Sequence, residues 1–380
     1  MFVNQEYFCE GLSVAPLVLV ESPTAPAQRR TERPADGVFA LVGSQPNNFY
    51  GSYFMDKQIA VRRYQKADFL AWNAFVSKCK NGTFLFDRNF MEHHDSRFTD
   101  FSLVIQIGQR WQAILPANIV DEVLHSHQFL TYGGLVFQDG LKQIEAIEIL
   151  KAILIFLESL NIKTLVLKLI PTIYHKKPAN DLSYALWLAN AKLMGRDCLK
   201  VVDLRQDFKI SKTRQEAIRR GQKNELKIVE EANFEPFWTQ VLTPNMLNRH
   251  GTKPIHSACE IQNLQVKFPE SIRHFNVYLN DQIVAGTTIF VCDNVVHPQH
   301  ISALENRSEL GSIDFLYHHL LTNVFADYHY FDFGCSNLSL GKKLDKNLIY
   351  WKETYGSSTV VQDFYEVETK NHIFLNDYLI

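Results

Sequence analysis

FNVYLNDQIVAGTTIFVCDNVVHPQHISALENRSELGSIDFLYHHLLTNVFADYHYFDFG, residues 275–334, is the stretch from which we predict the fold of this 380-residue chain. Apolar and polar residues alternate in three of its segments, 275–279, 283–292 and 297–304, and this alternation predicts three strands. Short turns rich in Asn and Asp separate the segments, and these residues tolerate the backbone conformations of tight turns. The pattern predicts an antiparallel meander.

A helix is expected directly after the meander. Gly311-Ser312 precede apolar residues with the spacing of one buried helical face, namely Ile313, Leu316, Tyr317, Leu320, Leu321, Val324 and Phe325. Residues 330–334 then read as a short aromatic strand. Residues 342–355 can form a second helix, which Gly356 ends as a left-handed cap. The predicted order is strand, strand, strand, helix, strand, helix.

The first part of the chain shows a similar order of elements. We expect a strand from Met55, a helix over 68–77, a hairpin of 101–107 and 111–115, a strand over 123–130, an apolar helix around 144–157, a strand over 164–170 and a helix over 183–193. Phe101 then corresponds to Phe275, His127 to His300, Ile144 to Ser312 and Thr164 to Tyr330. The offset stays near 170 residues, which indicates a duplicated domain and not a solenoid of short repeats.

These patterns predict an α/β (α+β) fold of two similar domains. Each domain is expected to hold a mixed, mostly antiparallel sheet flanked by helices, with domains at 55–200 and 201–380 and a boundary near Val201. Residues 1–54 are rich in Pro and contain Arg29-Arg30 and Arg33, so we expect a disordered tail. Alternatively, translation starts at Met55 and the tail comes from an upstream start codon.

Composition excludes several classes of protein. The formal net charge of −2 argues against a protein built wholly around nucleic acid, and charged residues interrupt the most apolar run, 144–160, so no membrane span is expected. The six cysteines are scattered without a CxxC pair, which fits a cytoplasmic protein.

His93-His94-Asp95 is a weak metal candidate, and we expect no metal. The motifs GxGxxG, HExxH and GxSxG are absent.

A basic stretch opens the second domain. Between Lys209 and Lys227 seven basic residues face two acidic ones, Glu216 and Glu225, which gives an excess of five positive charges; the seven are Lys209, Lys212, Arg214, Arg219, Arg220, Lys223 and Lys227. Phosphate groups are one partner for such a stretch. The other interpretation is a solvated helix face.

The end of the meander offers a candidate coenzyme site. A partly unpaired strand at 297–304 can bind an extended ligand, and free N–H groups at a helix N-terminus can hold phosphate. Coenzyme A is an extended ligand that carries phosphates, so such a site would suit it. The candidate residues are Arg307, Gly311, Ser312 and Ile313. An ordinary helix cap at Ser312 is the alternative.

Candidate catalytic groups lie on and beside the aromatic strand. Asp332 is an acid among aromatics, so it is either a general base or a loop anchor. Ser336 and Asn337 follow the strand's C-terminal end, where α/β sheets place reactive groups. His300 lies mid-strand and is either a base or a buried core histidine.

At these residues the chain resembles the FemAB-like branch of the GNAT acyltransferase superfamily, whose members carry two GNAT domains in tandem. The resemblance rests on Phe331-Asp332-Phe333-Gly334-Cys335-Ser336, Gly341 and Tyr350-Trp351-Lys352-Glu353-Thr354-Tyr355-Gly356. The basic stretch through Arg219, Arg220 and Lys223 also resembles the helix that opens the family's second domain. Ser308 stands where GNAT enzymes have Gln or Arg in their pyrophosphate loop.

The resemblance implies transfer of an acyl group, expected to be acetyl, from acetyl-CoA or another acyl-CoA to an amine of a cell-envelope or surface-polysaccharide precursor. The acceptor would be a phosphorylated small molecule or lipid-linked, its phosphates meeting Lys352, Arg219, Arg220 and Lys223, and Tyr350 or Ser336 would act as acid. Two alternatives stay open: an aminoacyl-tRNA-dependent transferase of FemAB type, with tRNA as partner, and a degenerate, non-catalytic binding module.

Overall fold

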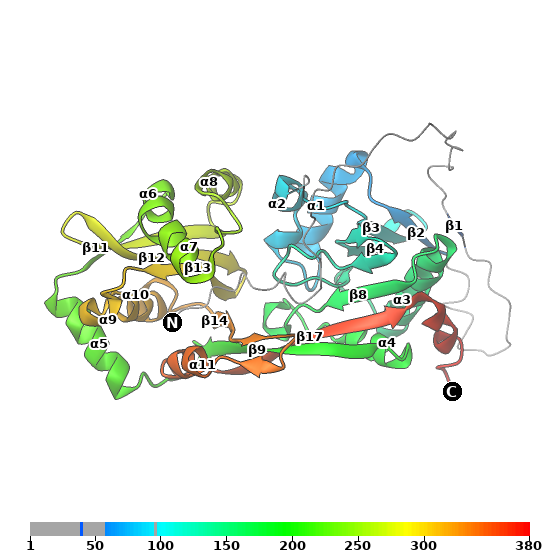
Figure 1. Cartoon of the computed structure of the whole chain (residues 1–380). Helices are drawn as coiled ribbons and strands as arrows, with labels where there is room; N and C mark the ends of the chain where they lie inside the picture. Colours follow the sequence, from blue (N-terminus) through cyan, green and yellow to red (C-terminus); the bar gives the residue numbers. More distant parts are fainter. Residues whose placement is uncertain (1–38, 41–57, 95–96) are drawn as a thin grey trace, which may run out of the picture.

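The computed structural model of the chain describes residues 39–40, 58–94 and 97–380. The described part forms two halves that lie side by side and are joined by two long strands (Figure 1). Apart from 39–40, the Pro-rich stretch 1–54 lies outside the described residues, and so does Asp95.

The first half contains most of the strands and helices before residue 204. They are β1 (Phe39–Ala40), β2 (Ile59–Arg63), α1 (Phe69–Lys78), α2 (Arg88–Met91), β3 (Leu103–Ile107), β4 (Arg110–Leu115), β5 (Asn118–Val120), β6 (Val123–His125), β7 (Val136–Phe137), α3 (Gln143–Ser159), β8 (Thr164–Lys168), α4 (Asp181–Leu188) and β9 (Lys192–Asp203). Short 3-10 turns lie at Lys66–Asp68, Phe84–Phe86, Glu92–His94 and Thr172–Tyr174.

The second half follows β9. Its elements are α5 (Lys212–Lys223), β10 (Lys227–Glu230), α6 (Glu235–Phe237), α7 (Thr243–His250), α8 (Ala258–Lys267), β11 (Ile272–Leu279), β12 (Gln282–Cys292), β13 (Val295–Ala303), α9 (Arg307–Leu310), α10 (Ser312–His319), β14 (Tyr330–Cys335), β15 (Asn337–Leu338), β16 (Lys343–Leu344), α11 (Lys346–Glu353) and β17 (Ser358–Glu368). π-helical turns occupy Trp238–Leu242 and Leu320–Val324, and Thr369–Leu375 is a 3-10 segment.

Antiparallel pairing dominates the sheets, as predicted. One sheet has the order β1-β2-β3-β4-β7, and a large sheet has the order β10-β11-β12-β13-β14-β9-β17-β8-β6-β5. The pairs β11–β12 and β12–β13 are antiparallel, so the predicted meander is confirmed. The mixed fold of two similar halves is confirmed as well.

Equivalent elements recur in the two halves, with two corrections to the predicted correspondence. The elements β3, β4, β7, α3 and β8 match β11, β12, β13, α10 and β14 in order. His127 does not match His300, because His127 lies in a loop at φ +47° and the two-residue β7 takes the place of β13. The helix expected over 183–193 ends at Leu188, since the chain turns at Asn190, where φ is +51°, into β9.

The two halves exchange their last strands. β9 follows the first half's α4 but pairs with β14 of the second half, whereas β17 follows α11 but pairs with β8 of the first half. β9 and β17 also pair with each other, antiparallel, over Lys192–Val201 and Ser358–Glu366. The expected boundary at Val201 falls inside β9, and Val201 is opposite both Asp332 and Ser358. The division into 55–200 and 201–380 stays a prediction.

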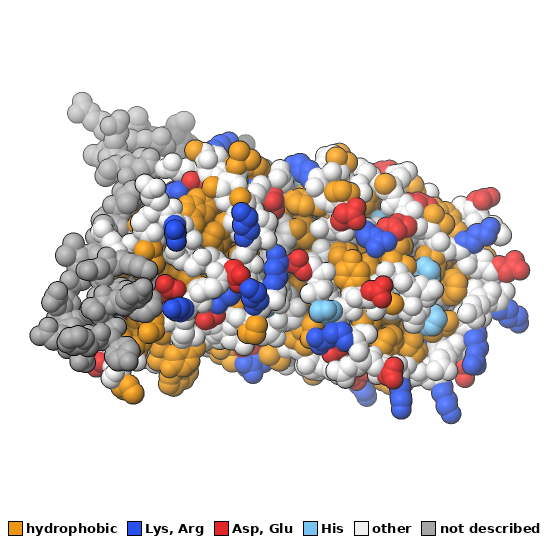
Figure 2. Space-filling model, turned by 180° about the vertical axis from the view of Figure 1, so that it is seen from behind, with side chains coloured by type: hydrophobic (Ala, Val, Ile, Leu, Met, Phe, Trp, Pro, Cys, Tyr) orange, Lys and Arg blue, Asp and Glu red, His pale blue; other side chains and the backbone are white. Residues whose placement is uncertain are grey.

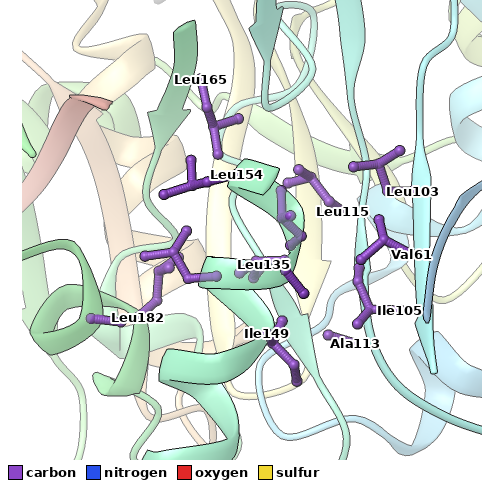
Figure 3. Close-up of a cluster of buried hydrophobic side chains, with 14 of the residues drawn as sticks. Val61, Leu103, Ile105, Ala113, Leu115, Leu135, Ile149, Leu154, Leu165 and Leu182 are labelled. Carbon is purple, nitrogen blue, oxygen red and sulfur yellow. The ribbon is translucent and has the colours of Figure 1, made fainter. Parts of the chain in front are cut away.

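Each half has its own apolar core. In the first half, α3 packs Ile149 and Leu154 against strand residues such as Leu103 and Leu115 (Figure 3). In the second half, the predicted face of α10 and the following turn is buried at Ile313, Leu316, Tyr317, Leu320, Leu321 and Phe325. Burial of one such side chain contributes about 1.5–3 kcal/mol, so both helices are held mainly by packing.

The strand exchange predicts that the halves do not fold alone. Separate fragments 58–200 and 201–380 each lack one exchanged strand and leave an open sheet edge. We expect neither fragment to show cooperative urea unfolding by circular dichroism, while co-expression yields a complex that does. A cooperative transition of fragment 58–200 on its own would contradict this expectation.

Candidate active site

A gap opens in the large sheet between β13 and β14. The two strands pair in parallel at only two positions, Val295 with Tyr330 and Val296 with Phe331. Beyond them, His297 Nδ1 donates a hydrogen bond to the main-chain oxygen of Asp332 over 2.9 Å. A bulge leaves Gln299 without a partner on β12, since the register shifts there. The strands therefore part at the level of Asp332.

Asp332 is buried at this point and is held by both halves. Its side chain is 2% exposed and accepts hydrogen bonds from the Tyr174 hydroxyl and the Gly334 N–H, both over 2.7 Å. Tyr174 belongs to the first half, and burial, together with the charge of Asp332, raises the pKa of Tyr174 well above its usual value, which keeps its hydroxyl a donor. A carboxylate has about four lone-pair sites, so Asp332 retains acceptor capacity.

His297 supports Asp332 from β13. Its Nδ1 also lies 3.7 Å from Asp332 Oδ2, and burial is the main cause that lowers the pKa of His297. The neutral ring then carries its hydrogen on Nδ1, because the acceptor is a carbonyl oxygen. His297 therefore holds the backbone of Asp332 in place, and its neutral ring forms no ion pair with the carboxylate.

Asp332 faces a pocket between the two halves, with about 650 Å³ of empty space when the open mouth is included. Its floor crosses four neighbouring strands, with Asp332 and Cys335 on β14, Leu199 on β9, Gln362 on β17 and Lys168 on β8. Phe129, Tyr132 and Tyr174 add aromatic walls from the first half. The strand exchange thus builds the floor of the pocket.

Lys352 holds the turn that follows Asp332. Its side chain is 3% exposed, and Nζ donates to the main-chain oxygens of Gly334 over 3.0 Å and Cys335 over 2.6 Å. Burial lowers the pKa of Lys352 to about 8. These contacts place Lys352 beneath the turn that orients Asp332, and the phosphate role predicted for it stays a prediction.

The other predicted catalytic residues lie around this turn but are not among the residues that line the pocket. Asn337 donates from Nδ2 to Asp197 over 2.6 Å and accepts the Cys198 N–H over 2.7 Å, which ties the turn to β9. Ser336 is 2% exposed, and Tyr350 is 59% exposed on α11. Asn337 thus holds the turn against β9, and the catalytic roles predicted for Asn337, Ser336 and Tyr350 stay predictions.

His300 is brought together with a second histidine. It is fully buried on β13, its Nε2 lies 3.3 Å from His256 Nδ1, and its ring is 5.1 Å from that of Trp238. On β12 His300 is opposite Thr288, on the far side of the bulge from Pro298, which is opposite Ile289. Of the two predicted bases, Asp332 lines the pocket and His300 does not.

Helix α5 closes over the predicted coenzyme site. Gly311 has φ +70°, and a Cβ placed there would lie 2.1 Å from the main-chain oxygen of Ala217 in α5. Arg220 of α5 donates to the Ser308 oxygen over 3.1 Å, one turn earlier. The backbone of α5 therefore lies directly against the turn at Arg307, Gly311, Ser312 and Ile313, where a coenzyme A pyrophosphate was predicted to bind.

A carboxylate of the chain itself occupies the first turn of α10. Asp314 accepts hydrogen bonds from Arg214 Nη1 over 2.8 Å, the Tyr355 hydroxyl over 2.7 Å and Trp351 Nε1 over 3.3 Å. The N-terminus of a helix favours an anion. Asp314 provides one, and Arg214 extends from α5 to pair with it.

The predicted phosphate-binding residues of α5 are all exposed, although Arg220 also donates to Ser308. Arg219, Arg220 and Lys223 are exposed, while Ala217, Ile218 and Gly221 are buried. α5 lies at the outer end of the second half (Figure 1), and Lys and Arg side chains protrude at that end (Figure 2). The structure therefore keeps these residues apart from the pocket.

Several site residues were missed by the sequence analysis. Tyr174, Tyr132, Lys168, Gln362 and His297 contribute to the pocket or to Asp332. One signal was present, because Tyr174 lies in the segment that follows the C-terminal end of β8, and Ser336 directly follows β14. The others depend on which strands become neighbours, and residue patterns do not reveal that.

The fold is shared with two solved structures at low sequence identity. FemX superposes with a TM-score of 0.56 at 10% identity, covering 80% of this chain and 96% of FemX. L-PGS from Bacillus licheniformis superposes with a TM-score of 0.52 at 12% identity, covering 80% of this chain and 91% of that one. This is the tandem GNAT fold of the FemAB-like branch. The shared fold agrees with the fold that the resemblance implied.

No protein-family model matches the sequence, and neither does any curated protein. Among the helices of the described residues, none is both long and apolar enough to cross a bilayer. Within the same residues, no group of three or more potential metal ligands comes together.

The lowered pKa of the buried Lys352 predicts that the stability of the fold depends on pH. Because burial lowers its pKa from 10.5 to about 8, the folded state binds fewer protons at this site than the unfolded state between these values. Wild-type protein should therefore gain stability relative to Lys352→Met as pH rises from 8 to 9.5, by at most about 1.4 kcal/mol per pH unit. Urea unfolding at several pH values measures the difference. The exposed Lys342→Met is the control, and a wild-type difference as flat as the control's would contradict the prediction.

Proposed function

We propose that this chain is an N-acyltransferase that takes an aminoacyl group from an aminoacyl-tRNA and transfers it to an amine bound beside Asp332. The observation that carries the proposal is the position of α5. Its inner face fills the turn where a coenzyme A pyrophosphate would bind, and its outer face carries Arg219 and Lys223. Helix α5 thus disfavours binding of coenzyme A on its inner side, and its outer side carries positive charges that can bind the phosphates of a tRNA.

Asp332 has the surroundings that a general base for acyl transfer needs. The attacking amine must lose a proton as its nitrogen forms a bond to the acyl carbon. Asp332 can accept this proton, and the ester C–O bond to the tRNA ribose then breaks, with the proton passing to the released oxygen. The Tyr174 hydroxyl and the Gly334 N–H fix the orientation of the carboxylate.

The donor is tested by calorimetry with acetyl-CoA and, separately, with a mixture of charged tRNAs. We expect binding of charged tRNA that weakens steeply with salt and no micromolar binding of acetyl-CoA. Micromolar acetyl-CoA binding without tRNA binding would overturn the proposed donor. If neither ligand bound detectably, a non-catalytic role would be favoured.

The role of α5 is tested by removing two of its exposed charges. In the double variant Arg219→Gln, Lys223→Gln we expect the slope of log K against log salt to fall by about 1.5, with roughly tenfold weaker tRNA binding at moderate salt. Arg220 is left intact, because it anchors Ser308. The control is Lys163→Gln, Lys370→Gln on the first half, both exposed. Equal losses in the two double variants would argue against α5 as the tRNA contact.

The base assignment predicts a loss of turnover on replacement of the carboxylate. We expect Asp332→Asn to lower kcat about 10²–10⁴-fold, the usual contribution of a general base. His300→Gln should lower kcat less than tenfold, because His300 lies outside the pocket lining. Single-turnover transfer from charged tRNA measures both. If Asp332→Asn kept full turnover at unchanged melting temperature, the base would have to be another group.

A further inference from the structure

His297 has one ring nitrogen that forms no hydrogen bond with any described residue. This atom, Nε2, is buried in a side chain that is 3% exposed, while Nδ1 donates to the main-chain oxygen of Asp332 over 2.9 Å. Buried polar atoms without a partner are uncommon in folded proteins. The Nδ1 contact alone does not call for a histidine, because the side-chain amide of an asparagine can donate the same hydrogen bond.

The unpaired nitrogen favours the neutral ring. A proton on Nε2 would create a buried N–H group that finds no acceptor among the described residues. Burial is accordingly the main cause that lowers the pKa of His297. The ring is therefore neutral near pH 7, with its hydrogen on Nδ1.

The titratable groups around His297 act on this balance in opposite directions. The carboxylate of Asp332, whose Oδ2 lies 3.7 Å from Nδ1, favours the protonated ring. Lys352 and His300 oppose protonation, and the residue opposite His297 on β12 is the apolar Phe290. Burial lowers the pKa of Lys352 to about 8, so Lys352 keeps its charge below pH 7. Asp332 is therefore the one of these groups that draws a proton onto His297 as the pH falls.

A proton on His297 would change what Asp332 can do. A cation 3.7 Å away stabilises the charge of the carboxylate and makes it a weaker proton acceptor. The Tyr174 hydroxyl and the Gly334 N–H already donate to the same carboxylate. Two groups that interact this closely titrate as a pair. A first proton therefore removes the free base, whichever of the two groups holds it.

We infer that His297 is a positioning residue that leaves Asp332 available as a base only while its own ring is neutral. The inference rests on the proposed function for the role of Asp332. It assigns the loss of transfer at acid pH to the pair of His297 and Asp332. A histidine with a purely structural role would affect the transfer rate by the same factor at every pH.

The coupling is tested without substrate by nuclear magnetic resonance of the full chain, labelled with ¹⁵N in its histidine rings. The variant His297→Asn identifies the His297 signals by their loss. We expect the neutral ring to carry its hydrogen on Nδ1. In Asp332→Asn the proton affinity of His297 should fall about tenfold or more, because the neutral amide no longer stabilises the imidazolium. His318, a half-buried histidine on α10, should titrate alike in both proteins.

Two outcomes of this measurement would overturn the inference. One is a neutral His297 ring with its hydrogen on Nε2, and the other is equal titration of His297 in wild type and Asp332→Asn.

Kinetics test the consequence for transfer. Single-turnover transfer from charged tRNA to glycinamide is measured between pH 7.5 and 5.5 for wild type and His297→Asn. The asparagine amide can keep the hydrogen bond to the Asp332 oxygen but takes up no proton in this range. The ratio of the variant rate to the wild-type rate should rise about fivefold or more as the pH falls, and taking the ratio cancels the ionisation of glycinamide.

His318→Asn is the matched control and should give a constant ratio. Thermal melting checks that His297→Asn is folded, and His297→Gln, which also takes up no proton, replaces it if it is not. A constant ratio for the His297 variant would overturn the inference.

The two measurements separate this inference from the proposed function. If wild type transfers nothing from charged tRNA, the proposed donor fails, and the resonance measurement still decides whether His297 and Asp332 are coupled. Transfer with a constant ratio would keep the proposed donor and refute the role of His297.

Discussion

The reciprocal exchange of β9 and β17 is the constraint on which the rest of the structure depends. The backbone groups of β14 find their partners on β9, and those of β8 find theirs on β17. Unpaired backbone groups are costly when buried, so each half needs the other to complete its sheet. The exchange fixes the relative position of the halves and makes one continuous floor from Lys168 to Asp332.

Asp332 shows how the two halves share the cost of one buried charge. A carboxylate that is 2% exposed is stable only with hydrogen-bond partners. The second half supplies Gly334 N–H and the supporting His297, and the first half supplies the Tyr174 hydroxyl. Lys352 in turn holds the turn that presents Gly334. The site is therefore a property of the assembled chain.

The contact between α5 and α10 decides which donor the fold can accept. Gly311 lies against Ala217, and Gly221 of α5 lies so close to Phe315 that an added Cβ would be 2.5 Å from it. Two glycines thus allow α5 to cover the start of α10, and Asp314 supplies the anion that this helix terminus favours. A solvent-exposed helix face remains for a larger anionic partner.

Local patterns in the sequence determined much of this fold. Alternation from Phe275 to Ala303 predicted the meander, and the apolar spacing from Ile313 to Phe325 predicted α10, because burial of one face follows the period of each element. The same patterns identified Asp332, since an acid flanked by Phe331 and Phe333 stands out on a strand. The correspondence of His127 with His300 failed, because β5 and β6 insert before β7 and shift the spacing.

Only the tertiary structure decided which strands are neighbours and therefore what the pocket contains. Neither β9 nor β17 was predicted as a strand, since a helix was expected over 183–193 and no element was assigned after Gly356, so the sequence alone did not reveal the exchange. Tyr174, Lys168 and Gln362 join Asp332 through that pairing, over separations of up to 194 residues between Lys168 and Gln362. Residue type is local information, while the environment of a side chain is set by long-range hydrogen bonding and packing.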